Sequence, residues 1–158
     1  MQQKVILCQG LPACGKSTYA RELVLQNENW VRVNKDDIRA MLHNNRFSRS
    51  NEKLTVAARN FMITDALTRG YNVVVDDTNF AGNVEHIKHV VNEWWNAHPH
   101  DDLLGKDYPE IEVKKFPVPL SVCLGRNALR EGYARVPEEV ILRMFNSYVK
   151  GTDLEVPE

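Results

Sequence analysis

Glycines and a lysine near the N-terminus are the first residues whose types and spacing suggest chemistry. Gly10 is followed, after four residues, by Gly15, Lys16 and Ser17, which fits the Walker A pattern GxxxxGK(S/T). Such glycines let successive backbone N–H groups point toward an anion, which the positive end of the following helix also faces. Lys16 would reach the β- and γ-phosphates of ATP, and the Ser17 hydroxyl would bind Mg²⁺. The predicted phosphate-binding loop consists of Gly10, Leu11, Pro12, Ala13, Cys14, Gly15, Lys16, Ser17 and Thr18.

Acidic residues follow two of the predicted strands. The stretch "VNKDDIR" contains Asp36 and Asp37, and "VVVDDTN" contains Asp77 and Thr78. Ligands of parallel sheets bind where strands end, so Asp36 is a candidate general base for an attacking hydroxyl. Asp77 is a candidate for orienting Mg²⁺ or its waters. Helix capping or turn formation is the alternative for these carboxylates, for Asp37 in particular.

Three arginines are candidates for contacts with phosphate. Arg39 lies one helical turn after Asp36, and Arg126 and Arg130 have the spacing that places two side chains on one helix face. In phosphoryl transfer, a movable segment that carries arginines can neutralise charge on the migrating group. A solvated helix surface is the alternative for each of them.

Short β-rich runs alternate with helical patterns along the chain. This alternation predicts right-handed crossovers and a parallel sheet, and the continuous runs "KVIL" and "NVVV" fit strands buried on both faces. We expect an α/β fold, a three-layer sandwich around a central parallel sheet. The predicted strands are Lys4 to Gln9, Trp30 to Asn34, Tyr71 to Asp77 and Ile111 to Val118. The predicted helices are Ser17 to Gln26, Asp36 to His43, Asn51 to Arg69, Val84 to Ala97, Pro119 to Glu131 and Pro137 to Lys150.

Length and composition predict one globular domain. The chain has 158 residues, 43% of them apolar, and a net charge of −1. The near-zero charge excludes a global basic surface, so any contact with a polyanion must be local. Three cysteines, an odd number, suggest reduced thiols in a cytoplasm, and no apolar run predicts export or a membrane span. We expect a domain over residues 1–151, a polar excursion over residues 96–110 and a loose tail over residues 152–158.

Taken in order, "GLPACGKSTYARE", "VNKDDIR", "VVVDDTN" and "GRNALREGYARVPEEVILRMFNSY" resemble the kinase domain of phage polynucleotide 5′-hydroxyl kinases. The resemblance implies an adenylate-kinase-like P-loop NTPase fold that uses ATP and Mg²⁺ to phosphorylate the 5′-hydroxyl of DNA or RNA. It implies that Asp36 is the base and that Arg39 grips the phosphate beside the acceptor nucleoside. Asp77 and Thr78 would serve the acceptor or the metal, and Arg126 and Arg130 would close over ATP.

Two residues depart from the pattern of that family. Ala13 stands where the loop often has glycine, and Lys35 replaces an arginine, which keeps the charge but loses the planar fork. Neither change removes a catalytic group. A phosphatase domain often follows this kinase domain, and the chain ends where it would begin.

Two other functions remain open at the level of sequence. A small-molecule kinase of the same fold is favoured by the low net charge, whereas Lys35, Arg39, Arg46, Arg49 and Lys53 near the expected acceptor entrance favour a nucleic-acid end. A non-catalytic ATP-binding switch is the other alternative, but it would not need Asp36. Neither the sugar type of the acceptor nor the oligomeric state follows from the sequence.

Overall fold

The computed structural model describes residues 2–98 and 107–158 of the chain. Four parallel strands form one sheet in the order β2-β3-β1-β4. The strands are β1 (Lys4–Gln9), β2 (Trp30–Val33), β3 (Asn72–Val75) and β4 (Glu110–Lys115). The expected α/β fold with a central parallel sheet is confirmed, and each strand lies within three residues of its predicted bounds.

Helices cover both faces of this sheet. They are α1 (Lys16–Gln26), α2 (Lys35–His43), α3 (Arg49–Thr68), α4 (Asn83–Ala97), α5 (Leu120–Ala128) and α6 (Glu138–Met144). A short 3₁₀ turn (Gly132–Ala134) separates α5 from α6, and five residues of π-helix (Phe145–Val149) continue α6. In the described part of the chain, no helix is both long and apolar enough to cross a bilayer.

The alternation of side chains along β1 explains the three layers. Val5 and Leu7 pack with buried residues of α3 and α4, whereas Ile6 and Cys8 pack with Ala20 of α1. Both sets are apolar because the strand is buried on its two faces. Trp94 anchors α4 in the first layer, where its indole N–H donates to the Thr68 hydroxyl at 2.9 Å.

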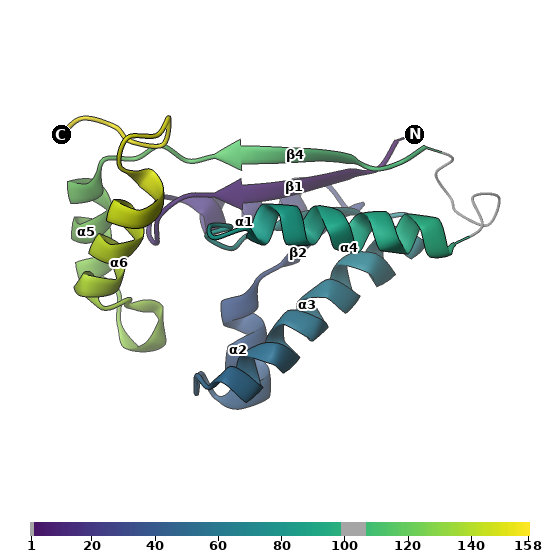
Figure 1. Ribbon diagram of the computed structural model, residues 1–158, viewed down its shortest axis with the longest axis horizontal. Helices are drawn as coiled ribbons and strands as arrows, with labels where there is room; N and C mark the ends of the chain where they lie inside the picture. The colour runs from purple at the N-terminus through teal and green to yellow at the C-terminus, as the bar shows by residue number, and fades with distance from the viewer. Residues whose placement is uncertain (1, 99–106) are drawn as a thin grey trace.

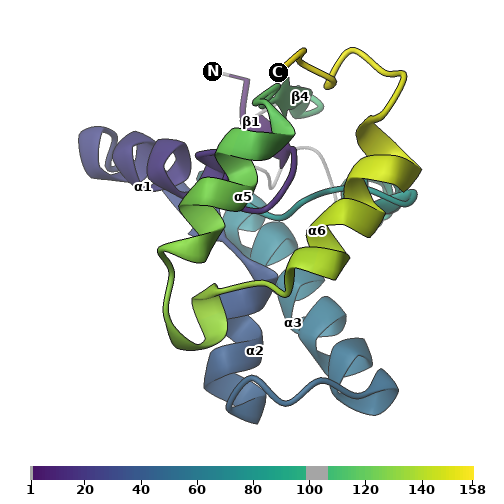
Figure 2. The same ribbon diagram turned by 90° about the vertical axis from the view of Figure 1, so that its left-hand side faces the viewer.

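The carboxyl ends of the parallel strands lie at one edge of the sheet, where the glycine-rich loop begins. In Figure 1 the arrows of β1 and β4 point toward α5 and α6, and α2 with the first half of α3 extends away from the sheet. Figure 2 looks onto this edge and shows α5 and α6 in front of it, with α2 below them. Each helix that begins at this edge can therefore place side chains near the glycine-rich loop.

Two expectations about the C-terminal third were wrong. The predicted helix over Pro119 to Glu131 stops at Ala128, because Asn127 bonds the backbone of Val136 through both amide atoms and draws the chain back. The final segment is not loose: Leu154 is 5% exposed in a cluster with Leu11. Asp153 also pairs with Lys115. Most of the predicted excursion, residues 99–106, lies outside the described residues.

Candidate active site

The glycine-rich loop holds a buried lysine without a carboxylate partner. Lys16 is 7% exposed, and its Nζ donates to the carbonyl oxygens of Gly10 at 2.8 Å and Leu11 at 2.6 Å. Among the described residues no acid forms an ion pair with it. Its third contact is Cys14 Sγ at 3.4 Å, and a buried ammonium group held by neutral acceptors remains a strong site for an anion.

Backbone conformation explains the residues of the loop. Gly15 has φ 100° and Ala13 has φ 64°, both in the left-handed region that favours glycine. The Ala13 value gives a physical reason why glycine is common at this position in the family it resembles. Gly10 is required by packing, since an added Cβ would lie 2.7 Å from Cys14 Sγ and 3.1 Å from the Phe116 carbonyl oxygen.

The first turn of α1 is left open for an anion. Its N-cap, Gly15, provides no side-chain hydrogen bond, and the first turn contains no acidic residue. By contrast, α2 is capped by the Asn34 side chain and α3 by Ser48, and both carry acids in the first turn. Free N–H groups and the helix dipole therefore meet Lys16 at one place, which suits the phosphates of a nucleotide.

Asp36 is exposed and yet fixed in position. Its side chain is 84% exposed, and Arg39 donates from Nη1 to its Oδ1 at 2.7 Å. Glu52 of α3 clamps the same guanidinium through Nε at 3.1 Å and Nη2 at 3.0 Å. Because the Arg39 side chain is held from two sides, the carboxylate of Asp36 is oriented while its second oxygen stays open to solvent.

Asp37 does not cap α2, contrary to one of the alternatives for it. The N-cap is Asn34, whose side chain accepts from the Asp37 N–H at 2.9 Å. The Asp37 carboxylate pairs instead with Arg32 at 2.6 Å. Arg32 also holds the buried Asp76 at 2.7 Å and so links β2 to the end of β3. Arg32 thus binds both Asp37 and Asp76, while the buried Oδ1 of Asp76 has no hydrogen-bond partner.

Asp77 lies buried behind the loop, at the end of β3. Its Oδ1 accepts from the Lys35 N–H at 2.8 Å, whereas the buried Oδ2 has no hydrogen-bond partner. Burial raises the pKa of this carboxyl above its usual range, against the hydrogen bond from Lys35 and the charges of Lys35 and Arg59. The next residue ties this strand end to the loop, since the Thr78 carbonyl accepts from the Gly10 N–H at 3.2 Å.

Sequence reasoning missed Arg59, the largest fully buried side chain. Its Nη1 donates to Asn83 Oδ1 at 2.8 Å and lies 3.9 Å from Asp77 Oδ2. Burial lowers the pKa of the guanidinium, against the charges of Asp77 and Glu52. A signal was present in the sequence, because Thr55, Arg59 and Ile63 share the buried stripe of α3 at four-residue spacing.

The two C-terminal arginines do not share a helix face as predicted. Arg126 lies in α5 and points its Nη1 to the Ala13 carbonyl of the loop at 3.5 Å. Arg130 follows the end of α5, and its Nη1 donates to the Ala134 carbonyl at 3.3 Å. Only Arg126 contacts the phosphate-binding loop in this conformation.

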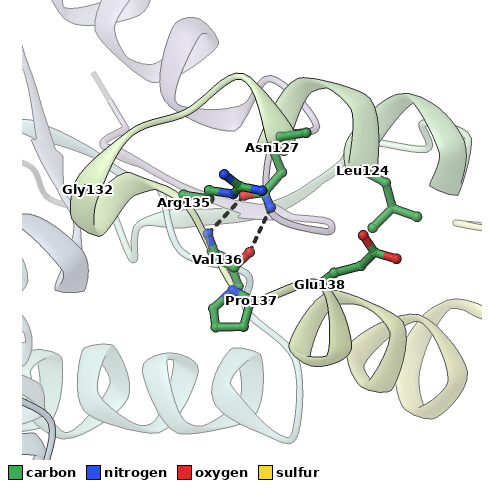
Figure 3. Close-up of a pocket in the computed structure, with 8 residues that line it drawn as sticks. Leu124, Asn127, Gly132, Arg135, Val136, Pro137 and Glu138 are labelled. Atoms are coloured by element: carbon green, nitrogen blue, oxygen red, sulfur yellow. Dashed lines mark hydrogen bonds between the residues drawn. The ribbon is translucent and has the colours of Figure 1, made fainter.

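A pocket of about 320 Å³ lies between α5 and α6. Leu124, Ala128, Val136 and Pro137 give it apolar walls, and Arg135 and Glu138 lie among its polar lining. Figure 3 shows the two hydrogen bonds between Asn127 and Val136 that hold one side of it. No residue of the glycine-rich loop lines this pocket, so it is a neighbour of the phosphate site and not part of it.

Metal binding by protein groups alone is not indicated. No group of three or more His, Cys, Asp or Glu residues that could hold an ion occurs within residues 2–98 and 107–158. Among the described residues at this strand end, Asp76 Oδ1 and Asp77 Oδ2 are buried without a hydrogen-bond partner and could face a divalent cation or its water, although Arg59 lies 3.9 Å from Asp77 Oδ2. The Ser17 hydroxyl is a further candidate ligand. Mg²⁺ in this class of site takes most of its remaining ligands from phosphates and water.

A parallel sheet in this order, with a glycine-rich loop leading from β1 into an uncapped helix, defines a P-loop nucleotide-binding domain of the kinase type. The chain belongs to the AAA_33 family, described as an AAA domain, which residues 5–150 match.

Known proteins similar to the chain include a kinase and a chain of an RNA repair complex. L-seryl-tRNA(Sec) kinase of Methanococcus maripaludis is 27% identical over 148 residues, which are 91% of this chain and 52% of that kinase. A chain of the Pnkp1/Rnl/Hen1 RNA repair complex superposes with a TM-score of 0.73 at 24% identity, over 92% of this chain and 43% of that one. A chain in a second structure of that complex superposes with a TM-score of 0.64 at 25% identity, over 86% of this chain and 43% of that one. The chain therefore spans about half the length of these relatives.

Proposed function

We propose that this domain transfers the γ-phosphate of ATP to the 5′-hydroxyl end of a DNA or RNA strand. The observation that carries the proposal is Asp36, an exposed carboxylate fixed by Arg39 at the strand-end edge that also holds the Lys16 loop. A nucleotide switch needs no such base. The likeness to a chain of an RNA repair complex supports a nucleic-acid acceptor.

The reaction forms one P–O bond and breaks one. The acceptor hydroxyl oxygen attacks the γ-phosphorus, its proton passes to the open oxygen of Asp36, and the bond to the β-phosphate oxygen breaks to leave ADP. Lys16 and the first-turn N–H groups of α1 hold the β- and γ-phosphates. Mg²⁺, which Ser17 and Asp77 would help to hold, would offset phosphate charge. Arg126 would neutralise charge on the migrating phosphoryl group above the loop. Arg130 would add a second positive charge there if the segment after α5 closes.

Arg39 can serve both the base and the acceptor. A guanidinium has five N–H donors, and the bonds to Asp36 and Glu52 leave one on Nη1 unused. A phosphate next to the acceptor nucleoside could take that donor. The 5′-hydroxyl of that nucleoside would then lie near Asp36, which is the arrangement that the transfer requires.

An acceptor panel with labelled ATP tests the proposal. The panel contains a 5′-hydroxyl oligonucleotide of each sugar type, a nucleoside 3′-monophosphate and a free nucleoside. We expect transfer to the oligonucleotides and the 3′-monophosphate, and little to the nucleoside. Equal transfer to the free nucleoside, or no transfer to any 5′-hydroxyl strand while ATP binds, would refute the proposal.

The similar L-seryl-tRNA(Sec) kinase favours a second candidate function, phosphorylation of a hydroxyl on an amino acid that a tRNA carries. That kinase matches 91% of this chain. Adding seryl-tRNA to the acceptor panel separates the two candidates. Phosphate on the seryl hydroxyl, with none on 5′-hydroxyl ends, would select this second function.

A further inference from the structure

The segment that joins α2 to α3 places an aromatic ring in solvent. Residues 44–49, called the α2–α3 tip below, include Phe47, which is 71% exposed. Both Figure 1 and Figure 2 show this segment at the end of the α2–α3 pair farthest from the sheet. Single exposed apolar side chains are common on protein surfaces, so the case for a binding surface rests on the charged residues near this ring.

The tip has a defined backbone, held by several hydrogen bonds. Asn44 and Asn45 take left-handed conformations, with φ 49° and 63°. The Asn44 N–H donates to the Ala40 carbonyl at 3.1 Å, and the Asn51 side chain donates to the Arg46 carbonyl at 2.9 Å. Ser48 caps α3 by accepting from the Asn51 N–H at 3.0 Å. The ring is therefore carried on a fixed support.

Three cations without acidic partners lie close to this ring in sequence. Arg46 and Arg49 flank Phe47 in sequence, Lys53 lies one turn further along α3, and all three are exposed. No described carboxylate lies within ion-pair distance of any of them. The acid of this region, Glu52, is already taken by Arg39 and Lys35. The tip thus combines an aromatic face with uncompensated positive charge in a chain whose net charge is −1.

Helix geometry sets the distance from this surface to the proposed base. Asp36 lies in the first turn of α2 and His43 ends it, so the tip lies roughly 10–15 Å from Asp36 at 1.5 Å per residue. Stacked bases follow one another at about 3.4 Å along a strand. A strand whose 5′-hydroxyl lies at Asp36 would therefore reach the tip with about its fourth or fifth nucleotide.

We propose that the α2–α3 tip is a binding surface for the acceptor strand, on which Phe47 stacks against a base and Arg46, Arg49 and Lys53 contact the backbone phosphates. This inference rests on the proposed function and extends it from the reacting end to the nucleotides that follow. Aromatic rings between cations are typical of proteins that bind single strands without sequence preference. The exposed Met41 nearby would also suit a protein partner, but the unpaired cations favour a polyanion.

Acceptor length provides the main test. KM and kcat are measured for 5′-hydroxyl acceptors of two and of eight nucleotides, in both sugar types, with Phe47→Ala. We expect KM for the octamer to rise about five- to a hundredfold, the range for loss of one stacked base. KM for the dinucleotide and kcat for both should stay within about twofold. An equal change at both lengths, or none, would overturn the proposal.

Phe61→Ala is the matched control. Phe61 is 68% exposed on the same helix α3, but the arginine near it in sequence, Arg59, is fully buried. This variant should leave octamer KM unchanged. Phe47→Trp should keep tight octamer binding, whereas Phe47→Leu, which keeps apolar surface without a ring, should not. Equal loss in Phe61→Ala, or full retention in Phe47→Leu, would contradict a stacking surface.

Salt and assembly provide independent readouts. Arg46→Ala with Arg49→Ala should flatten the slope of log affinity for the octamer against log salt by about 1 to 1.5, at ~0.7 per phosphate. If Phe47→Ala instead converts a dimer to a monomer in sedimentation velocity, the tip is an interface between copies and the proposal falls.

Fluorescence anisotropy with a labelled octamer measures binding to the tip independently of catalysis. Weaker octamer binding by Phe47→Ala than by the parent would support the tip as a binding surface even if no 5′-hydroxyl is phosphorylated and the proposed function fails, and equal binding would overturn it.

Discussion

At the scale of single residues, Lys16 and Asp36 differ in how their charges are held. Lys16 is buried and bonded to carbonyls, so its charge is uncompensated and directed into the loop. Asp36 is exposed and bonded to an arginine, so its charge is partly offset while one oxygen stays free. The first arrangement suits binding of an anion, and the second suits proton transfer.

Lys16→Ala should abolish transfer and strongly weaken ATP binding. The first turn of α1 contains no other cation, and Arg126 contacts the loop only at the Ala13 carbonyl, so the charge lost from inside the loop is not replaced. Isothermal titration with a non-hydrolysable ATP analogue measures the effect. Lys88→Ala, which removes an exposed lysine on α4, is the control and should bind as the parent does. Unchanged affinity in Lys16→Ala would mean that the loop is not a nucleotide site.

Asp36→Asn should retain ATP affinity and lose at least about 10² in turnover, since an amide keeps the shape but cannot accept the proton. Single-turnover kinetics with the acceptor from the panel gives the rate. Asp37→Asn is the neighbouring control, because Asp37 pairs with Arg32 and should affect turnover by less than about threefold. A mutant Asp36→Asn with near-normal turnover would move the base to Asp77 or remove it.

At the scale of elements, α5 brings a cation to the loop and the final segment packs against the same region. Arg126 reaches the Ala13 carbonyl from the last turn of α5. Leu154 packs with Leu11 of the loop in one apolar cluster. The C-terminal third of the chain therefore supports the phosphate site as well as supplying a candidate catalytic arginine.

Arg126→Ala should lower kcat by about 10² while changing the Kd for ATP much less, because a cation over the loop acts mostly as charge develops. Steady-state kinetics and titration give the two values. Arg143→Ala, in the last turn of α6, is the control. A loss confined to acceptor KM would place Arg126 on the path of the nucleic acid instead.

Leu154→Ala should reduce the free energy of unfolding by about 2–4 kcal/mol, the usual cost of truncating a buried leucine. Urea unfolding followed by circular dichroism measures it. Leu25 is 85% exposed on α1, and Leu25→Ala should cost less than about 0.5 kcal/mol. Equal effects of the two substitutions would show that residues 152–158 are loose in solution, as the sequence suggested.

At the scale of the whole molecule, folding keeps two thiols neutral. Burial, with the charge of Asp76 next in size, raises the pKa of Cys8 to about 12. Burial likewise raises the pKa of Cys123 to about 11, with Cys14 adding to it. Because both values exceed those of an unfolded thiol, the folded state binds more protons above pH ~8.5, and stability must fall as pH rises there.

The free energy of unfolding should therefore drop between pH 8.0 and pH 9.5, by about 1 kcal/mol for each of these thiols. Urea unfolding at the two pH values measures the drop. The double variant Cys8→Ala with Cys123→Ala will be less stable overall, but its stability should change less between the two pH values. The same drop in the parent and the double variant would assign it to other groups.

The sequence alone determined the features that depend on short-range geometry. A glycine at a left-handed position, the lysine that directly follows it and apolar runs that alternate with helical patterns are local features, so the loop, the parallel sheet and most helix bounds could be predicted. Asp36, Asp77 and Arg39 were recognised as candidates because they follow strands or lie one turn apart on a helix. Their roles remain proposals.

Only the tertiary structure decided which groups meet across elements. Glu52 reaches Arg39 because α3 packs on α2, and Arg59 lies behind Asp77 because α3 also packs on β3. The end of α5 was mispredicted because Asn127 bonds Val136, a contact that helix propensity cannot report. Leu154 is buried by a cluster gathered from distant segments. Periodicity identifies which side of a helix is apolar, but the partner on that side is chosen by the packing of the whole chain.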